Sequence, residues 1–548
     1  MTNDLKRNGK IIAQKFREYF LPTVLTALAN NIAVMVDSVI VGNLLGSNAM
    51  SAINLLSPIV QLYFSLTILF GMGASVIIAY SKGKNDARAA DRAFTCGFVS
   101  IAALSVILMA AQLALYEQIA GALTDIPELK AELIKYYIPF IIGTPFSLAL
   151  PAAVHCIRSD GAPKLASALI IISNAINLIM DLLLMGVFKT DITGSSVATV
   201  IGNIAACAVM LFHFKSKKNT LRFDFSMLKS GFAREFFALF TTGASGALGT
   251  LLITVRMFFL NDLIQRTADK EGLAAMSVIS MYQIFVSAFI TGASQTMVPI
   301  VSALYGERDR NGIKYAFRSA VAILMISTAV IVFILEFAAE PSARLFGEKT
   351  AEEMAVIVPA LRITALSFFG QSLAFLIMYY FTAIKKKALS VIVSISAGAA
   401  IIIPCAYWFS AVWGIEGIWR SFNAAMYGTL AVTAICVPIY AKKHGCAVPF
   451  LLWDKSDEVI SLSASRGNSV AEIEERLAGN VGDAVKIAVL DIFSHFKNGV
   501  GPALCDIRVL REDGKTVVYF RSTGAAEEPC GYEQSRTLGM NQIKAKIE

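Results

Sequence analysis

Long apolar runs separated by short charged stretches are the feature that most restricts what this chain can fold into. An α-helix needs about 20 mostly apolar residues to cross the hydrocarbon core of a bilayer. We therefore expect an all-α polytopic membrane protein with twelve membrane-spanning helices. The twelve runs lie approximately at residues 18–40, 51–80, 93–115, 134–156, 165–187, 194–214, 233–258, 274–303, 314–337, 355–383, 388–411 and 417–441.

The composition excludes several other classes of protein. Apolar residues make up 56% of the 548 residues and charged residues 16%, whereas a soluble domain carries about 25% charged residues. These values exclude a soluble enzyme, a disordered chain and a nucleic-acid binder. The eight cysteines and four histidines are dispersed, and no nucleophile–base set or phosphate-binding loop is present. We therefore predict that the protein is not an enzyme, and that it has no resident metal or cofactor.

The charged residues between the runs predict the orientation in the membrane. Loops after even-numbered runs are basic, whereas loops after odd-numbered runs are neutral or acidic. Cytoplasmic loops carry the excess of Lys and Arg in membrane proteins. We therefore predict a multi-pass protein of the cell membrane with both termini in the cytoplasm. The basic residues include Lys6, Arg7, Lys10, Lys82, Lys84, Arg88, Arg92, Lys215, Lys229, Arg308, Arg310, Lys314 and Lys385 to Lys387.

The chain contains an internal repeat with an offset of 223 residues. This single shift aligns Gly83 with Gly306, Asp86 with Asp309, and Lys164 with Lys387. Both copies begin on the same side, so they are parallel six-helix units. Transporters built in this way bind substrate between the halves and rock them alternately. We expect an N-terminal lobe at 1–222 and a C-terminal lobe at 223–448.

A few polar side chains lie deep within the apolar runs, where ionisable groups are costly and usually functional. Counted from the points where their helices enter the membrane, near residue 20 and near Lys164, Asp37 and Asp181 each lie 17 residues further on. This is roughly 25 Å along a core about 30 Å thick. Asn177 shares a helix face with Asp181, and Thr199 lies at a similar depth. Two carboxylates beside an amide and a hydroxyl can hold one H+ or one Na+, and an arriving cation would expel the proton.

The repeat provides an internal control for this cluster. Asp37 aligns with Leu260, Asn177 with Ala400, and Asp181 with Pro404. The fold therefore does not need the acids twice, which favours a functional role. The alternative interpretation is that both acids lie near the interface and reach headgroup water.

Other polar residues in the runs are candidates for the wall of a central cavity. Asn30 and Asn31 lie lower on the first helix. Arg256 could line the cavity, although a side chain reaching the interface is the favoured explanation, and Arg420 could do either. Gln283 could line the wall or pack between helices, as could Tyr282, Gln371, Tyr379 and Tyr380; for these we favour packing.

Four motifs resemble those of the MATE family of multidrug and toxic-compound exporters. They are Val36–Gly42, Ser294–Val301 followed by Tyr305-Gly306, Asn177–Asp181 and Gly194–Thr199. The resemblance covers about residues 10–445. It implies twelve helices in two six-helix lobes, and export of organic cations or similar amphiphiles driven by inward H+ or Na+.

The resemblance also implies where the coupling cation binds. In the DinF-like branch the matching residues, here Asp37, Asn177, Asp181 and Thr199, form the cation site in the N-terminal lobe. Another branch uses acids in helices 7 and 10, and this sequence has none well inside those runs. The family therefore implies the same four residues as the depth of the side chains does.

Residues 449–548 differ in character from the rest of the chain. They contain 12 Lys and Arg against 15 Asp and Glu, whereas the remainder has a net charge of +11. We expect helices at Ser469–Leu477 and Ala484–Phe496, then strands at Asp506–Leu510 and Thr516–Arg521 joined by a turn at Glu512–Gly514, then a helix. The order predicts a small α+β cytoplasmic domain.

This tail resembles part of the GHKL ATPase fold of anti-sigma-factor kinases, in a degenerate form. His495 stands where the family has a metal-binding Asn, and Ser522-Thr523-Gly524 lacks the adenine-binding Asp. We therefore predict that it does not hydrolyse ATP. A regulatory role, or binding of a cytoplasmic protein partner to residues 449–548, stays open.

Together these features predict a secondary antiporter for a small cationic or amphiphilic molecule, working as a monomer in the lipid bilayer. Two alternatives stay open. One is a flippase for lipid-linked precursors from the same superfamily, and the other is a membrane-anchored signalling protein that acts through its tail.

Overall fold

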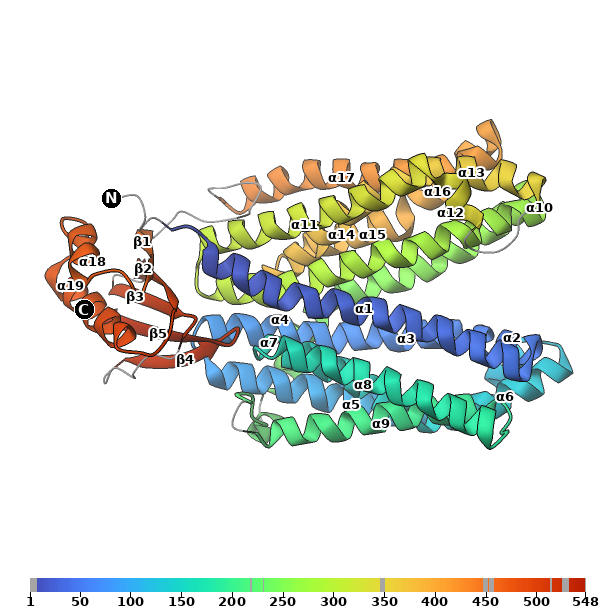
Figure 1. The fold of residues 1–548 in the computed structure, drawn as a ribbon, viewed down its shortest axis with the longest axis horizontal. Helices are drawn as coiled ribbons and strands as arrows, with labels where there is room; N and C mark the ends of the chain where they lie inside the picture. Colours follow the sequence, from blue (N-terminus) through green and yellow to red (C-terminus); the bar gives the residue numbers. More distant parts are fainter. Residues whose placement is uncertain are drawn as a thin grey trace.

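The computed structural model shows a long helical body with a small mixed domain at one end (Figure 1). The structure describes residues 7–216, 219–229, 231–344, 350–446, 452, 458–512, 515–524 and 532–547. The helices of the body are α1 (Lys10–Leu45), α2 (Ser47–Leu55), α3 (Ser57–Thr67), η1 (Ile68–Met72), α4 (Gly73–Gly83), α5 (Ala87–Leu123), α6 (Pro127–Ile142), α7 (Thr144–Ser159), α8 (Pro163–Asp181), η2 (Leu182–Val187), α9 (Thr193–Phe214), η3 (Phe225–Leu228), α10 (Phe232–Gly306), α11 (Arg310–Phe337), α12 (Ala339–Arg344), α13 (Ala351–Ala365), α14 (Ser367–Ala383), α15 (Lys387–Ile395), η4 (Ser396–Ala400), α16 (Ile402–Trp413) and α17 (Ile415–Lys443).

The expected number of membrane spans is confirmed. Within the described residues, ten helical segments are long and apolar enough to cross a membrane, and two bent helix pairs bring the number to twelve. The pair α6–α7 bends by 55° and the pair α13–α14 by 41°. The bends fall at Gly143 and Leu366, which the 223-residue offset makes equivalent. The repeat therefore extends to the shape of the helices.

The helices form two lobes that contact each other near the C-terminal domain, an end we call the domain end (Figure 1). Helix α10 contains two spans, Phe232–Ala268 and Glu271–Gly306, so both of its ends lie at the domain end. Here α4 of the first lobe crosses the last turns of the second span without intervening side chains. A Cβ atom on Gly83 would lie 2.0 Å from the Ala303 carbonyl oxygen, and one on Gly306 would lie 2.2 Å from that of Tyr80. Small residues permit such close approach of helices, and this pair is related by the repeat.

The first turns of α1 and α10 also join the lobes. Phe16 of α1 is buried in the apolar core of the second lobe, and its repeat equivalent, Leu239 of α10, is buried in the core of the first lobe. Each half thus inserts its first helix into the other. This exchange of helix starts ties the lobes together at the domain end.

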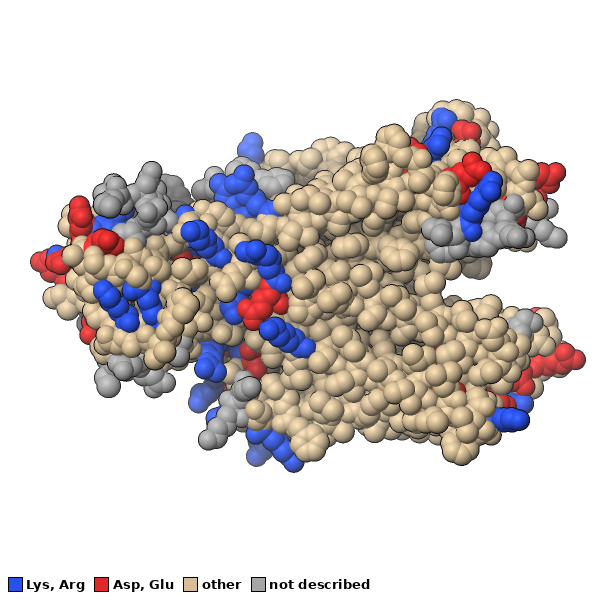
Figure 2. All heavy atoms as spheres, in the orientation of Figure 1, with Lys and Arg blue, Asp and Glu red and all other residues tan. Residues whose placement is uncertain are grey.

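At the opposite end, which we call the far end, the lobes separate and leave a cleft (Figure 2). Lys and Arg side chains gather around the junction with the C-terminal domain, and acidic side chains are prominent at the far end (Figure 2). This is the distribution on which the predicted orientation depends.

The C-terminal domain is a five-stranded antiparallel sheet with two helices. Its sheet has the order β1-β2-β3-β5-β4, and the helices pack on it through Ile473, Phe493 and Phe496. The elements are β1 (Glu458–Ser465), α18 (Val470–Leu477), α19 (Asp483–Lys497), β2 (Leu504–Glu512), β3 (Lys515–Ser522), β4 (Glu533–Thr537) and β5 (Met540–Ile547).

The prediction for this domain was correct in its middle and wrong at both ends. The helices at Ser469–Leu477 and Ala484–Phe496 and the two central strands are present, whereas Asp513 and Gly514 of the expected turn lie outside the described residues. Strand β1 was not expected. The final element is the β4–β5 hairpin and not a helix, because Leu538 and Gly539 have φ values of 56° and 71° and form a two-residue turn.

A buried cluster of charges anchors this domain to the second lobe. Arg508 of β2 lies 3.0 Å from a Glu307 carboxylate oxygen, and Arg521 of β3 pairs with Glu307 and, at 3.4 Å, with Asp309. Arg7 joins Asp309 at 2.7 Å and Asp506 of β2 at 3.1 Å. These six side chains are at most 5% exposed, and their formal charges cancel.

Asp309, in the loop between α10 and α11, lies at the centre of the cluster, and its neighbours favour the charged form of its carboxyl group. Burial favours the neutral acid, but Arg508 and Arg7 together hold the pKa of Asp309 below its ordinary value. Asp309 also accepts a hydrogen bond from the Gly312 amide at 2.8 Å, which caps α11. One residue therefore begins a membrane helix and anchors the C-terminal domain.

The close crossing of α4 and α10 generates a prediction. Gly83→Ala should destabilise the protein by about 1–3 kcal/mol, because the added methyl group overlaps a backbone oxygen that cannot move alone. Thermal unfolding of the purified protein in detergent measures the effect. The control is Gly428→Ala, whose Cβ would meet only the Ile401 side chain, at 3.5 Å. Equal stability of the two variants would contradict the proposed close contact.

Candidate functional site

The structure brings Asp37 and Asp181 together inside the first lobe. Asp37 projects from α1 and Asp181 is the last residue of α8, and their carboxyl groups face each other. Asp37 accepts a hydrogen bond from the Ser195 hydroxyl at 3.4 Å. Asp181 is 0% exposed, and neither of its oxygens has a hydrogen-bond partner among the described residues.

Asn177 and Thr199 lie beside the acids and link α8 to α9. The Asn177 amide donates to the Thr199 hydroxyl at 3.1 Å, and that hydroxyl donates to the Ser195 carbonyl at 3.2 Å. The helices approach closely because Gly202 has no side chain: a Cβ there would lie 2.5 Å from the Ser173 carbonyl oxygen. All four predicted residues thus share one region.

Two neighbours of the acids were not expected from the sequence. Ser195 lies one helical turn before Thr199, on the same face of α9. Tyr136 of α6 is buried and lies near both carboxylates. The spacing of Ser195 from Thr199 was a signal in the sequence, whereas no motif or spacing linked Tyr136 to the two aspartates.

The backbone changes its winding immediately after Asp181. Residues Leu182–Val187 form a π-helical segment, η2, whereas Asp181 itself ends a regular α-helix. Single π-helical turns are rare and occur frequently at functional sites. The equivalent of Asp181 in the second half is Pro404, within the regular helix α16. The second half has a π-helical segment of its own, η4, but it ends before Pro404, so the two halves differ in where the irregularity lies.

This arrangement can hold one small cation or one proton. Two carboxylates in an apolar membrane interior cannot both stay charged without a compensating positive charge. Carboxylate, amide and hydroxyl oxygens are the ligands that hard cations prefer. The four residues supply such oxygens, so the chemistry of the site fits Na+ or H+.

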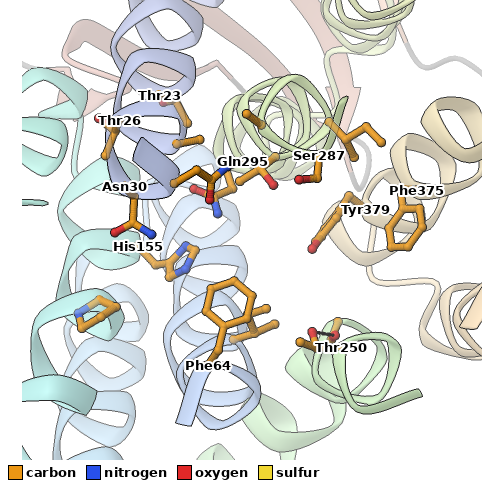
Figure 3. A pocket seen from close by; sticks show the side chains of 18 of the residues that line it. Thr23, Thr26, Asn30, Phe64, His155, Thr250, Ser287, Gln295, Phe375 and Tyr379 are labelled. Carbon is orange, nitrogen blue, oxygen red and sulfur yellow. Dashed lines mark hydrogen bonds between the residues drawn. The ribbon is translucent and has the colours of Figure 1, made fainter. Parts of the chain in front are cut away.

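A second feature is a cavity of about 440 Å³ between the lobes. Figure 3 shows labelled side chains surrounding it, among them Asn30, His155, Gln295 and Tyr379. They come from α1, α7, α10 and α14, which are drawn from both lobes. Apolar and aromatic groups, including Phe64, Phe375 and Met378, complete the wall.

A polar contact crosses the cavity from one lobe to the other. The Arg158 guanidinium on α7 donates to the Gln295 side-chain oxygen on α10 at 2.5 Å. Arg158 is 3% exposed, and the described residues that line the cavity include no Asp or Glu. Arg158, His155 and Gln295 were not predicted for the cavity, although Gln295 lies in the motif at Ser294–Val301.

A chain of amides connects the cavity to the acid site. Asn30 and Asn31 both line the cavity, and Asn30 accepts from the Asn174 amide at 3.4 Å. Asn174 precedes Asn177 by one helical turn on α8. The Asn31 amide donates to the Ile284 carbonyl oxygen at 3.5 Å and so joins α1 to α10. The middle of α1 therefore contacts the acid-bearing helix and the second lobe.

Three other candidates lie outside the described cavity lining. Arg256 is 1% exposed in the second lobe, 5.8 Å from the Phe422 ring centre, so the expected reach to the interface is wrong. Arg420 is exposed and pairs with Glu416 at 3.0 Å. Gln283 is not part of the lining, whereas Gln371 and Tyr379, for which packing was favoured, are part of it.

Comparison with known proteins identifies the family. The family profile described as MatE matches residues 22–183 and 247–408, which is more than half of the chain and one match in each half. The chain belongs to the MatE family. Members of this family are membrane transporters and not enzymes.

Curated relatives and solved structures agree with this family. The chain is 23% identical over 423 residues to the multidrug export protein MepA of Staphylococcus aureus strain N315, covering 76% of this chain and 92% of MepA. It resembles the outward-facing structure of a multidrug resistance MATE family transporter of the MOP superfamily, with a TM-score of 0.73, 18% identity, and coverage of 79% and 97%. A mutant of the Vibrio cholerae MATE transporter VcmN also has a TM-score of 0.73, with 17% identity and coverage of 78% and 98%.

The contact across the MatE cavity generates a prediction. Gln295→Leu should destabilise the protein by about 1–3 kcal/mol, because it leaves the buried Arg158 guanidinium without its acceptor. Thermal unfolding in detergent measures this loss. Gln283→Leu makes the same change on the same helix, away from the described lining, and should have little effect. Equal losses would show that the contact does not stabilise the protein.

Proposed function

We propose that the protein is a secondary antiporter that exports organic cations or other drug-like amphiphiles in exchange for inward H+ or Na+. The observation that carries this proposal is the pair formed by the half-buried Asp37 and the fully buried Asp181, with no hydrogen-bond donor to Asp181 among the described residues. Two such carboxylates stay together inside a membrane protein only when a proton or cation neutralises part of their charge. Occupancy of the site therefore changes the energy of the surrounding helices.

The path from ion binding to movement runs through α1. Its middle contacts α8 near the acids through Asn30 and Asn174, whereas its first turns are buried in the second lobe through Phe16. A change in the packing of α1 on α8 is therefore transmitted to the contact between the lobes. With the domain end in the cytoplasm, the cleft at the far end makes this the outward-open state.

The cavity lining suits an amphiphilic substrate. Phe64, Phe375 and Tyr379 offer aromatic faces that attract organic cations, and amide and hydroxyl groups offer weak, adaptable polar contacts. Arg158 is engaged by Gln295, so its charge is partly satisfied. The similarity to MepA, a multidrug export protein, and to a multidrug resistance transporter of known structure supports this substrate class.

The residues discussed above also support two more detailed assignments, one for the family branch and one for the tail. The acids in the first lobe support membership of the DinF-like branch, and the altered residues of the tail support a degenerate GHKL-like domain with a regulatory role.

A flippase for lipid-linked precursors would need several basic groups in the cavity. Arg256 and Arg420 lie outside the described lining, and Arg158, which is its one Arg or Lys, is held by Gln295. Export of amphiphiles is therefore the better-supported function.

Neutralising either acid should stop coupled transport. In vesicles or cells with an imposed H+ or Na+ gradient, Asp37→Asn and Asp181→Asn should lower gradient-driven efflux of a fluorescent organic cation by at least about tenfold, equivalent to about 1.4 kcal/mol. The control is Asp262→Asn, which removes a carboxylate that pairs with Arg266 at 3.1 Å on the surface of α10. Unchanged efflux in both site variants would refute the assignment of the coupling site.

Binding of the coupling ion should be visible without transport. If the ion is Na+, replacing KCl by NaCl in the buffer should raise the melting temperature in detergent, with about 2.7 kcal/mol of stabilisation at one hundred times the dissociation constant. If the ion is H+, the melting temperature should respond to pH and not to Na+. Either response should be absent in Asp181→Asn. A response that persists in this variant would place the ion elsewhere.

A further inference from the structure

The tip of the β4–β5 hairpin is buried against the membrane body and not in its own domain. Leu538 and Met540 are each 1% exposed and belong to the apolar core of the second lobe and α1, and neither belongs to the core of the C-terminal domain. Leu538 also adopts a φ of 56°, which is costly for a residue with a branched side chain. An apolar side chain therefore occupies the tip of the hairpin despite this cost in backbone energy.

The hairpin also contacts the first lobe directly. The Thr537 hydroxyl donates to the Lys82 carbonyl oxygen at 3.3 Å, and the Asn85 amide donates to a Glu533 carboxylate oxygen at 3.2 Å. Gly161, between α7 and α8, meets the tip so closely that a Cβ on it would lie 2.4 Å from the Gly539 nitrogen. These contacts involve loops and helix ends of the first lobe at the domain end.

The same sheet holds the second lobe through Arg508 of β2 and Arg521 of β3, which bind Glu307 and Asp309. The four strands β2, β3, β5 and β4 are hydrogen-bonded in this order. The distance between the two attachment sites is therefore fixed by a continuous sheet. One rigid unit is attached to both lobes at the end where the lobes contact each other.

Opening of the cavity at the domain end requires that Gly83 move away from Ala303, and hence that the lobes separate beneath the sheet. A rigid sheet cannot keep both attachments when this happens. The attachment to the second lobe consists of six buried charged groups, and removal of one partner would leave the others unpaired. The hairpin meets the first lobe only through the contacts of Thr537, Glu533 and Gly539 named above, which include no buried ion pair, so this attachment is the one that gives way.

We propose that the C-terminal domain is a latch for the transport cycle: it stays anchored to the second lobe through its arginines, and the β4–β5 hairpin must leave the first lobe before the cavity opens at the domain end. The proposal rests on the proposed function, because it concerns the regulation of that cavity. A molecule or protein that captured the free hairpin would raise the rate of opening.

The test weakens the hairpin contact without unfolding the hairpin. Leu538→Asn removes the apolar side chain that holds the hairpin tip in the body, where the neighbouring Gly539 meets Gly161 of the first lobe. It also creates an Asn-Gly turn, which is the favoured sequence for a two-residue hairpin. The probe is a single cysteine at Ala27, which lines the cavity, in a chain whose eight native cysteines are replaced. Its reaction with a membrane-impermeant maleimide, applied from the domain side of oriented vesicles, reports opening at that end.

The latch predicts that Leu538→Asn raises the labelling rate at least fivefold. Val500→Asn, a matched change at a side chain that is 97% exposed, should leave the rate unchanged. Equal rates in the unmodified chain and in Leu538→Asn would overturn the proposal. The readout needs no transport, so absence of gradient-driven efflux in the unmodified chain, together with faster labelling of Leu538→Asn, would refute the antiporter and leave the latch standing.

A second pair of variants tests whether the labelling rate depends on a direct contact between the hairpin and the first lobe. Asn85→Asp places a carboxylate opposite Glu533, and Asp tolerates the φ of 63° found at this position. It should raise the labelling rate, and addition of Glu533→Lys should return the rate toward that of the unmodified chain. Failure of the second change to reverse the first would contradict a direct contact between hairpin and lobe.

Discussion

The contact between the two lobes at one end is the constraint on which the rest of the structure depends. Helices α4 and α10 cross there on Gly83 and Gly306, with backbone against backbone, and α1 and α10 exchange their first turns between the lobes. Because the lobes are closed at this end and separate at the other, the cavity is accessible from one side. The C-terminal domain contacts both lobes at the closed end.

The structure holds two groups of charged side chains in its interior, one around Asp309 and one formed by Asp37 and Asp181, and they have different functions. The cluster around Asp309 contains three arginines and three carboxylates, so its charges compensate one another, and removal of one partner would cost about 3–5 kcal/mol. Asp37 and Asp181 are two acids without a basic partner in the described contacts. A balanced cluster suits a permanent joint, whereas an unbalanced pair suits a site that gains and loses a cation.

The repeat makes the functional asymmetry visible. The two halves share their bends, at Gly143 and Leu366, and their crossing glycines. The acid pair occurs in the first half only, and the π-helical segment after Asp181 has no counterpart at the equivalent position of the second half, within the described residues. In the proposed antiporter, the shared features serve the rocking movement and the unshared ones serve ion coupling.

The sequence predicted the spans and the acid cluster because both depend on local signals. The length of an apolar run identifies a membrane helix. The distance of Asp37 and Asp181 from the ends of their runs gives their depth in the membrane. Rotation about the helix axis is not a local property, which explains why Arg256 was expected at the interface and is buried. The anchoring of the C-terminal domain joins residues more than 200 positions apart, such as Arg521 and Glu307, and no periodicity or motif reports such a contact.

The most direct test of the account is a pair of distances between the lobes measured by spin-label spectroscopy. One pair of labels would replace the exposed residues Glu128 and Glu352 at the far end, and a second pair Arg88 and Lys314 at the domain end. The account predicts that addition of the coupling ion changes the two distances in opposite directions, and that Asp37→Asn abolishes the response. Distances that change together, or that respond equally in Asp37→Asn, would contradict alternating access controlled by the acid pair.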